Sequence, residues 1–231
     1  MSPQPESGIV APQAMLENRD IAQHGFVIRD LPATLLDELE HLEPTLTQLP
    51  AKHWTRVIRS STLTTDFAQD DPMSVAEHAQ ALSRMDSGEL CYSFLRIRCE
   101  DGNLELPAVR RLTAFLLSDP MRAFIREHAG RTVHALSVYY VNRFCDGDFL
   151  TTHRDAGDNL ALVINLTRNW HPVNGGVTFL LDQQNRIVQA LNPQFGQALM
   201  FDCRENTVPH FVSSVTSPSG RHRSAIVARY A

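Results

Sequence analysis

The second half of the chain alternates short apolar segments with turn-forming residues, and this pattern restricts the possible folds more than any other feature. Segments rich in Val, Ile, Leu and Phe are bounded by Gly, Pro, Asn and Asp, as is typical of β-strands joined by turns. The expected strands are 133–144, 149–155, 160–167, 177–181, 186–191, 197–201, 210–215 and 224–230. A series of this kind predicts a double-stranded β-helix, which is a jelly-roll or cupin-like core.

The first half of the chain has a different organisation. Residues 1–20 are rich in Pro, Ser and Gln, and we expect a flexible tail. Residues 21–131 mix helical periodicity, clearest at the leucines of 31–42, with short strand-like runs. We therefore expect an α+β fold with one domain over 21–231. In it, 21–131 would form helical and strand support and a lid, and 132–231 would form the jelly-roll core.

Composition excludes several classes of function. The net charge of −5 gives no general attraction to nucleic acid or anionic membranes, and no apolar run is long enough to span a bilayer. The N-terminus lacks the basic and apolar regions of a signal peptide, so we expect a cytoplasmic protein. Lys52 is the only lysine, which disfavours Schiff-base and P-loop chemistry. Anions are therefore expected to be bound by arginine, whose planar fork suits a carboxylate.

One His-x-Asp pair and one later histidine are the strongest candidates for a metal site. His153 and Asp155 lie two residues apart in an expected strand, so their side chains would point to the same face. Arg154 would point the opposite way, toward a surface ion pair. His210 begins a later expected strand. Two histidines and a carboxylate can hold an iron(II) ion on one face and leave the opposite face open.

Further residues extend this pattern toward a known family. Trp170 and the pair Gly175-Gly176 lie between the histidines, and Arg223 follows His210 at the start of the last expected strand. The whole series, over about residues 138–230, resembles the iron(II)/2-oxoglutarate-dependent dioxygenases, in particular their prolyl-4-hydroxylase-like branch. The resemblance implies an enzyme with iron(II), 2-oxoglutarate and dioxygen as cofactors, and with ascorbate as a candidate stimulant. The carboxylate at Asp155 favours hydroxylation over halogenation.

The resemblance also implies residues for the distal carboxylate of 2-oxoglutarate. Arg223 is the first choice, and Arg221 is a competitor because it would share the same strand face. Asn165 stands where the branch has a tyrosine, and an amide can also donate a hydrogen bond. Tyr140 could replace the hydroxyl that the family often has at the position of Phe144. Arg229 is expected either to contact the cofactor or to pair with an acidic residue.

The substrate is expected to be a small molecule, either a free amino acid or a related metabolite, which would be hydroxylated at an unactivated C–H bond with succinate and CO2 as co-products. Trp54 and Arg56 are candidate substrate contacts. The first alternative is a hydroxylase of a prolyl or other protein side chain, by analogy with the family branch. An alternative of another class is a non-catalytic, metal-binding jelly-roll or cupin-like protein, which would need no arginine for 2-oxoglutarate.

Overall fold

The structure is a computed structural model that describes residues 21–100 and 102–231. Its first part contains helices and strands: α1 (Ile21–His24), β1 (Phe26–Asp30), α2 (Ala33–Thr47), η2 (Ala51–His53), β2 (Thr55–Arg59), β3 (Thr64–Ala68), α3 (Met73–Ser83), η3 (Met85–Ser87), β4 (Tyr92–Arg98), α4 (Pro107–Leu116) and α5 (Asp119–Ala129). Its second part is almost entirely strands: β5 (Leu136–Phe144), β6 (Phe149–His153), β7 (Leu160–Asn165), η4 (Pro172–Asn174), β8 (Thr178–Leu181), β9 (Ile187–Leu191), β10 (Gln197–Asp202), β11 (His210–Val212) and β12 (Arg223–Tyr230). The expected tail, residues 1–20, lies outside the described residues.

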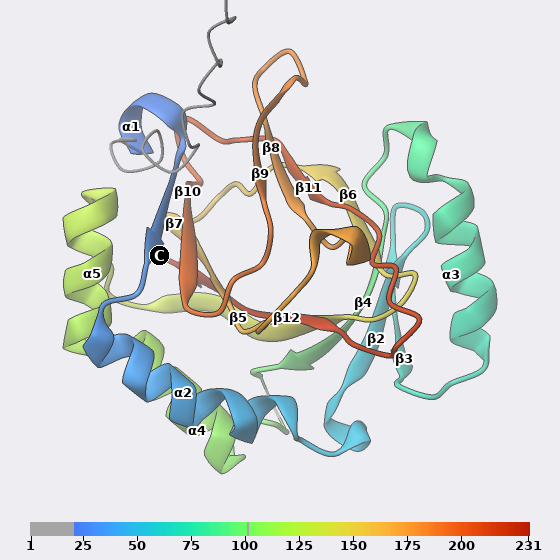
Figure 1. The fold of residues 1–231 in the computed structure, drawn as a ribbon, viewed down its shortest axis with the longest axis horizontal. Helices are drawn as coiled ribbons and strands as arrows, with labels where there is room; N and C mark the ends of the chain where they lie inside the picture. The colour runs from blue at the N-terminus through green and yellow to red at the C-terminus, as the bar shows by residue number, and fades with distance from the viewer. Residues whose placement is uncertain (1–20, 101) are drawn as a thin grey trace, which may run out of the picture.

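All the paired strands are antiparallel and form one continuous, curled sheet in the order β1-β10-β7-β12-β5-β4-β6-β11-β8-β9. Strands β2 and β3 extend it from β4. Figure 1 shows the sheet curling so that β6, β11, β8 and β9 lie across an interior from β10, β7, β12 and β5. This arrangement is the double-stranded β-helix that the strand pattern predicts.

The sheet takes strands from both halves of the chain. Strand β1 pairs with β10 from Phe26↔Phe201 to Asp30↔Gln197, and β4 lies between β5 and β6. The sheet therefore continues across residue 131, where the sequence suggested a division between support and core. The physical reason is that an open sheet edge has unpaired backbone groups, and a strand from elsewhere in the chain satisfies them.

Helices α2, α4 and α5 cover the outer face of the part of the sheet that runs from β1 to β4 (Figure 1). Helix α3 lies beside β2 and β4. The expected leucine face is seen in α2, where Leu35, Leu39, Leu42 and Leu46 are all buried. Tyr230, the last residue of β12, joins this core and donates a hydrogen bond of 2.9 Å to the Leu116 carbonyl.

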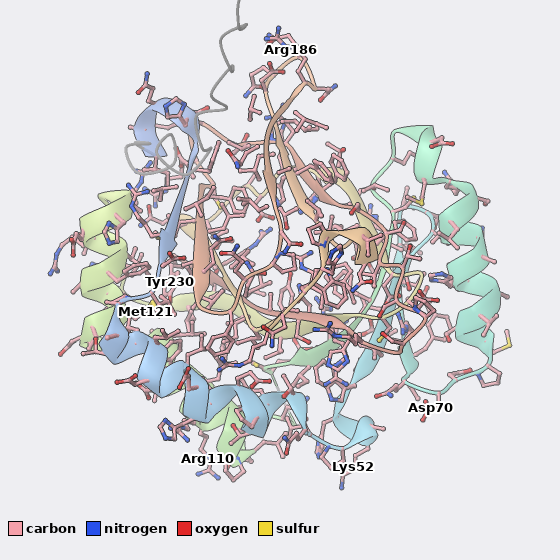
Figure 2. The ribbon with its side chains drawn as sticks, in the orientation of Figure 1. Lys52, Asp70, Arg110, Met121, Arg186 and Tyr230 are labelled. Atoms are coloured by element: carbon pink, nitrogen blue, oxygen red, sulfur yellow. The ribbon has the colours of Figure 1, made fainter. Side chains whose placement is uncertain are left out.

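Side-chain alternation in β12 separates this core from the barrel interior. Ile226, Ala228 and Tyr230 pack under the helices. Arg223 and Arg229 lie on the opposite face, which lines the interior, because successive strand residues point to opposite sides. Figure 2 shows Tyr230 near Met121 on the helical side, and it shows Lys52, the single lysine, at the periphery. No helix among residues 21–100 and 102–231 is long and apolar enough to cross a bilayer.

Candidate metal centre

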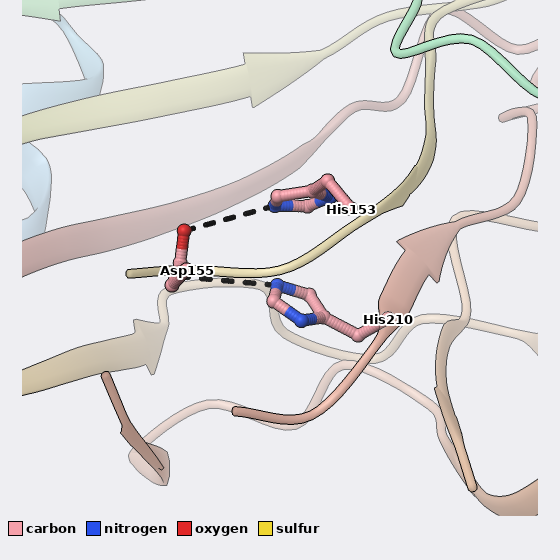
Figure 3. Close-up of side chains that lie close together, drawn as sticks. All are labelled: His153, Asp155 and His210. Atoms are coloured by element: carbon pink, nitrogen blue, oxygen red, sulfur yellow. Dashed lines mark ion pairs between the residues drawn. The ribbon is translucent and has the colours of Figure 1, made fainter. Parts of the chain in front are cut away.

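His153, Asp155 and His210 converge at one end of the barrel interior, as the sequence predicts. His153 ends β6, His210 begins β11, and the two histidines are register partners in the antiparallel pair. Nε2 of His153 lies 3.9 Å from Oδ1 of Asp155, and Nε2 of His210 lies 4.0 Å from Oδ2. Both imidazoles point toward the carboxylate (Figure 3). One ligand atom from each residue lies within 4.8 Å of the other two, so the group could hold a metal ion.

The reason given for the placement of Asp155 needs a correction. Strand β6 ends at His153, so Asp155 lies in the segment after the strand rather than on it. Strand alternation alone does not explain its position. Arg154 is exposed as expected, but it donates hydrogen bonds to the Thr207 carbonyl at 2.6 Å and to Oε1 of Gln183 at 2.9 Å, instead of forming a surface ion pair. These hydrogen bonds fix the position of the backbone that joins His153 to Asp155.

Backbone carbonyls fix the protonation of both imidazoles. Nδ1 of His153 lies 3.2 Å from the Thr151 carbonyl, and Nδ1 of His210 lies 2.9 Å from the Val208 carbonyl. A carbonyl only accepts, so each Nδ1 carries the proton and each Nε2 is free to coordinate. Burial lowers the pKa of His153, and burial together with the neighbouring His153 lowers the pKa of His210. Both rings are therefore neutral near pH 7, as metal ligation requires.

Arg229 balances the buried charge of Asp155. Its guanidinium forms an ion pair with Oδ1 of Asp155, and its Nη1 lies 3.5 Å from Oδ2 of Asp158. Of the two roles considered for Arg229, the structure therefore shows the acidic partner. The pairing fixes the orientation of the Asp155 carboxylate, which a metal-binding carboxylate needs.

Arg223 lies deeper in the barrel and carries a charge that no neighbour balances. The residue is 3% exposed, and Nη2 donates a hydrogen bond of 2.9 Å to Oγ1 of Thr178. Its Nε and Nη1 are buried without a hydrogen-bond partner, and no acidic side chain among the described residues pairs with it. Burial lowers the pKa of Arg223 to about 10, so the group is still charged at neutral pH. A carboxylate from outside the chain would satisfy both free nitrogens.

Two asparagines lie beside this arginine. The strand register aligns Asn142, Ala225 and Asn165 across β5, β12 and β7, one step along the interior face from Arg223. Oδ1 of Asn142 and Oδ1 of Asn165 are both buried without a hydrogen-bond partner. Ala225 leaves space between them. Sequence reasoning identified Asn165 but missed Asn142, although alternation in 133–144 places residue 142 on the same face as residues 140 and 144.

Tyr140 faces the interior, but at the metal end of the barrel. Its register partner is Val227, whereas Phe144 is the partner of Arg223. Burial raises the pKa of Tyr140 to about 12, and the charge of Asp155 adds to the shift. Tyr140 therefore lies near the triad and does not replace a hydroxyl beside Arg223. The ring of Phe144 packs against the Arg223 guanidinium, with 5.3 Å from Cζ to the ring centroid.

Arg221, the expected competitor of Arg223, lies outside the barrel. It is exposed and donates hydrogen bonds to the carbonyls of Arg168 at 2.9 Å and Asn169 at 2.6 Å. Strand β12 begins at Arg223, so the two-residue alternation does not extend back to residue 221. The expectation that Arg221 competes with Arg223 for 2-oxoglutarate is therefore wrong.

Trp54 and Arg56 also lie away from the interior. Trp54 is 2% exposed in the core under the helices, donates to the Leu49 carbonyl at 3.1 Å, and stacks under Arg143. Arg56 is the register partner of Leu95, which packs in that same core, so it faces outward and forms an ion pair with Asp148. Neither residue can contact a substrate in the barrel, because both lie on the face of the sheet that points away from it.

The glycine pair has a structural reason at this site. A Cβ on Gly175 would lie 2.0 Å from the Ser214 carbonyl oxygen, and a Cβ on Gly176 would lie 3.3 Å from Cδ of Arg223. Both glycines have positive φ values, 64° and 63°. The Gly175 carbonyl accepts a hydrogen bond of 2.9 Å from Nε1 of Trp170. The motif therefore lets this turn approach the arginine closely.

Two neutral imidazoles and a carboxylate at the end of a jelly-roll barrel define a class of protein, the non-haem iron oxygenases with a facial ligand triad. Residues 139–229 match the family model of the 2OG-Fe(II) oxygenase superfamily. This match confirms the resemblance seen in the sequence: residues 139–229 belong to the 2-oxoglutarate-dependent iron(II) dioxygenases, whose iron(II), 2-oxoglutarate and dioxygen fit the triad. No curated protein sequence matches the chain.

Solved structures support the same fold. A 2OG-Fe(II) oxygenase-family oxidoreductase from Burkholderia pseudomallei is 18% identical with a TM-score of 0.61, covering 91% of this chain and 87% of that one. A Pseudomonas putida prolyl-4-hydroxylase is 17% identical with a TM-score of 0.52, covering 91% and 94%. A Trichoplax adhaerens prolyl hydroxylase, in complex with a hypoxia-inducible-factor peptide fragment, is 16% identical with a TM-score of 0.54, covering 91% and 84%. At these identities the likeness concerns the fold.

Proposed function

We propose that this dioxygenase hydroxylates an unactivated C–H bond of a small molecule, a free amino acid or a related metabolite, with succinate and CO2 as co-products. His153, Asp155 and His210 would hold the iron(II) ion, and Arg223 with Asn165 would hold 2-oxoglutarate. We further propose that residues 21–231 act as one domain, since β1 and β4 belong to the same sheet as the site. The cytoplasmic location expected from the sequence is part of the same proposal.

The single observation that carries the proposal is the uncompensated charge of Arg223. A buried cation without a counter-ion is costly, and proteins keep such a group where a ligand supplies the opposite charge. Arg223 has two buried nitrogens without partners, and it lies on the same interior face as the triad's partner Arg229. A non-catalytic jelly-roll metal protein would have no use for this group.

The chain's own residues have distinct tasks in this reaction. The Nε2 atoms of the two histidines and the Asp155 carboxylate would bind the metal on one face. Arg229 would keep that carboxylate oriented, and Arg223 would orient the co-substrate from its far end. When bound, iron(II) and 2-oxoglutarate supply the oxidation of the C–H bond. The buried interior excludes water from this reaction.

Hydroxylation of a prolyl or other protein side chain is the second candidate. It is favoured by the Pseudomonas putida and Trichoplax adhaerens structures, which are prolyl hydroxylases, the latter with a peptide bound. The two candidates make opposite predictions in a turnover assay. A free amino acid should stimulate succinate formation if the first is right, and only peptides should do so if the second is right.

The test of the core proposal is an anaerobic titration of purified protein with iron(II) and 2-oxoglutarate. We expect the weak visible charge-transfer band of the chelate in the native protein and its absence in His153→Ala. Circular dichroism of both proteins controls for folding. A folded native protein without the band would overturn the proposal.

A further inference from the structure

A second arginine in the barrel interior has no counter-ion. Arg96 lies on β4 as the register partner of Asn142, so it shares the interior face with Asn142 and Arg223. Its guanidinium lies over the Tyr140 ring, with 5.0 Å from Cζ to the ring centroid. Within the described part of the chain it forms no ion pair and no hydrogen bond, and its Nε is buried without a partner.

Two other arginines of this region have acidic partners. Arg229 pairs with Asp155 and Asp158. Arg98, the next arginine on the interior face of β4, pairs with Asp66 and Glu100. Burial lowers the pKa of Arg96, and the charge of Arg98 lowers it further. The charge of Arg98 acts on Arg96 more strongly than the opposite charge of Asp66, and a bound anion would relieve the remaining positive field.

The co-substrate cannot supply that anion in the proposed arrangement. One carboxylate of 2-oxoglutarate would bind the metal, and the other would bind Arg223 and Asn165. Arg96 and Asn165 occupy the same register row, but β5 and β12 lie between their strands. Three strand spacings separate their backbones by about 14 Å. Arg96 is half-buried and lies away from the proposed 2-oxoglutarate contacts, so its guanidinium is available to a second anionic molecule.

The position of Arg96 relative to the triad points to the substrate. Tyr140 lies near both, since the charges of Asp155, Arg96 and Arg229 all act on its phenol. Arg96, Arg98, Val138 and Tyr140 also line a cavity of about 290 Å³ at this end of β4 and β5. Val138 is the register partner of Arg229, which contacts Asp155. The cavity, which Glu100 also lines, therefore lies at the end of β5 that carries Val138, next to Arg229.

We propose that Arg96 binds a carboxylate of the substrate, which makes the substrate class a small carboxylic acid such as a free amino acid. This inference rests on the proposed function and adds the anchor to it. A planar guanidinium next to an aromatic ring binds a carboxylate through two parallel hydrogen bonds. Tyr140 contacts Arg96 and lies near Asp155, so a substrate that reaches both the anchor and the metal would be one compact molecule.

The test compares free L-amino acids and small dicarboxylates with their carboxamides. Anaerobic binding is read from the shift of the iron(II)–2-oxoglutarate band, and turnover is read from succinate formation above the substrate-free rate. We expect a carboxylate ligand that binds at least about 10-fold more tightly than its amide. In Arg96→Gln its dissociation constant should rise about 10- to 100-fold, the usual effect of losing hydrogen bonds to a charged group, while the amide binds as before.

Three further variants sharpen the result. Arg96→Lys should recover part of the affinity, because it keeps the charge but loses the planar fork. Arg110→Gln is the control, since Arg110 is exposed on α4 and pairs with Glu105 away from the barrel interior, and it should leave discrimination between acid and amide unchanged. Arg59→Gln tests the other interior-face arginine of this region, which lies opposite Tyr92 and forms no ion pair among the described residues.

The outcomes separate this inference from the proposed function. A native protein that forms the chelate band but binds no carboxylate in preference to its amide overturns the anchor and leaves the dioxygenase site standing. Unchanged discrimination in Arg96→Gln, or its loss only in Arg59→Gln, overturns the anchor as well. Absence of the band in the native protein removes the proposed site and the anchor with it.

Discussion

Replacement of Arg223 should have opposite effects on ligand binding and on the stability of the free protein. The guanidinium has two buried nitrogens, Nε and Nη1, that lack partners and that would meet a carboxylate. Hydrogen bonds to a charged group contribute about 1.5–3 kcal/mol each, so two of them contribute about 3–6 kcal/mol. Arg223→Met should therefore raise the dissociation constant of 2-oxoglutarate about 10²- to 10⁴-fold.

The metal-free and ligand-free protein should respond in the other direction. In that state Arg223 has one protein hydrogen bond, to Thr178, and its charge is otherwise uncompensated. Replacing a buried charge with an apolar side chain of similar length often stabilises a protein by about 1–4 kcal/mol. In a domain of this size each kcal/mol changes Tm by about 2–4 °C. Arg223→Met should therefore unfold at a higher temperature than the native protein.

Two measurements check these signs. Anaerobic titration of the charge-transfer band gives the dissociation constant of 2-oxoglutarate, and thermal unfolding followed by circular dichroism gives Tm without ligands. Arg221→Gln is the matched control, because Arg221 is exposed and binds backbone carbonyls on the surface. It should change neither quantity. The reasoning is refuted if Arg223→Met keeps the native affinity, or if it lowers Tm as an ordinary core substitution would.

Three other perturbations follow from the same contacts. Trp54→Ala should lower the free energy of unfolding by about 3–5 kcal/mol, measured with denaturant, because Trp54 packs in the core under the helices. It should leave the affinity for 2-oxoglutarate unchanged. A loss of affinity without a loss of stability would contradict this placement of Trp54. Arg229→Gln should weaken iron(II) binding about 10- to 100-fold in a competition assay with a chelator, because Asp155 loses its ion-pair partner. Unchanged binding would show that Arg229 has a purely structural role. The metal-free protein should lose stability as the pH falls below about 6.5, because burial lowers the pKa of His210 and of His153 in the folded state, so the unfolded chain takes up protons first. Between pH 7.5 and pH 5.5 the Tm of His210→Phe should fall less than that of the native protein. An equal fall in both proteins would show that His210 is not the group responsible.

Strand alternation accounts for most of what the sequence could predict about the site. The period of two places Arg223 and Asn165 on interior faces, and the structure shows both there with unpartnered buried atoms. The same alternation does not apply to Arg221, because β12 begins at Arg223 and residue 221 lies before the strand. The sequence does not mark where a strand begins. Asn142 was missed because an asparagine within an apolar strand gives no local signal of what lies opposite it.

Long-range pairing accounts for most of what the sequence could not predict. The insertion of β4 between β5 and β6 brings Arg96 into the interior, but pairing between distant segments leaves no mark in either of them. The burial of Trp54 depends likewise on packing under the helices. Asp155 reached its predicted place although it lies beyond the end of β6, so the convergence with His210 depends on the β6–β11 register as well as on alternation.

The distribution of charge connects these observations. The chain carries a net charge of −5, so its overall field does not attract an anionic metabolite. Inside the barrel the balance is reversed, since Asp155 is already matched by Arg229, whereas Arg223 and Arg96 have no matching carboxylate among the described residues. The buried Arg223 and the half-buried Arg96 would each gain from a bound anion, and the proposed co-substrate and substrate would supply one each. On the proposal made above, the barrel would bind two carboxylate-bearing molecules, of which 2-oxoglutarate is one and the substrate is the other.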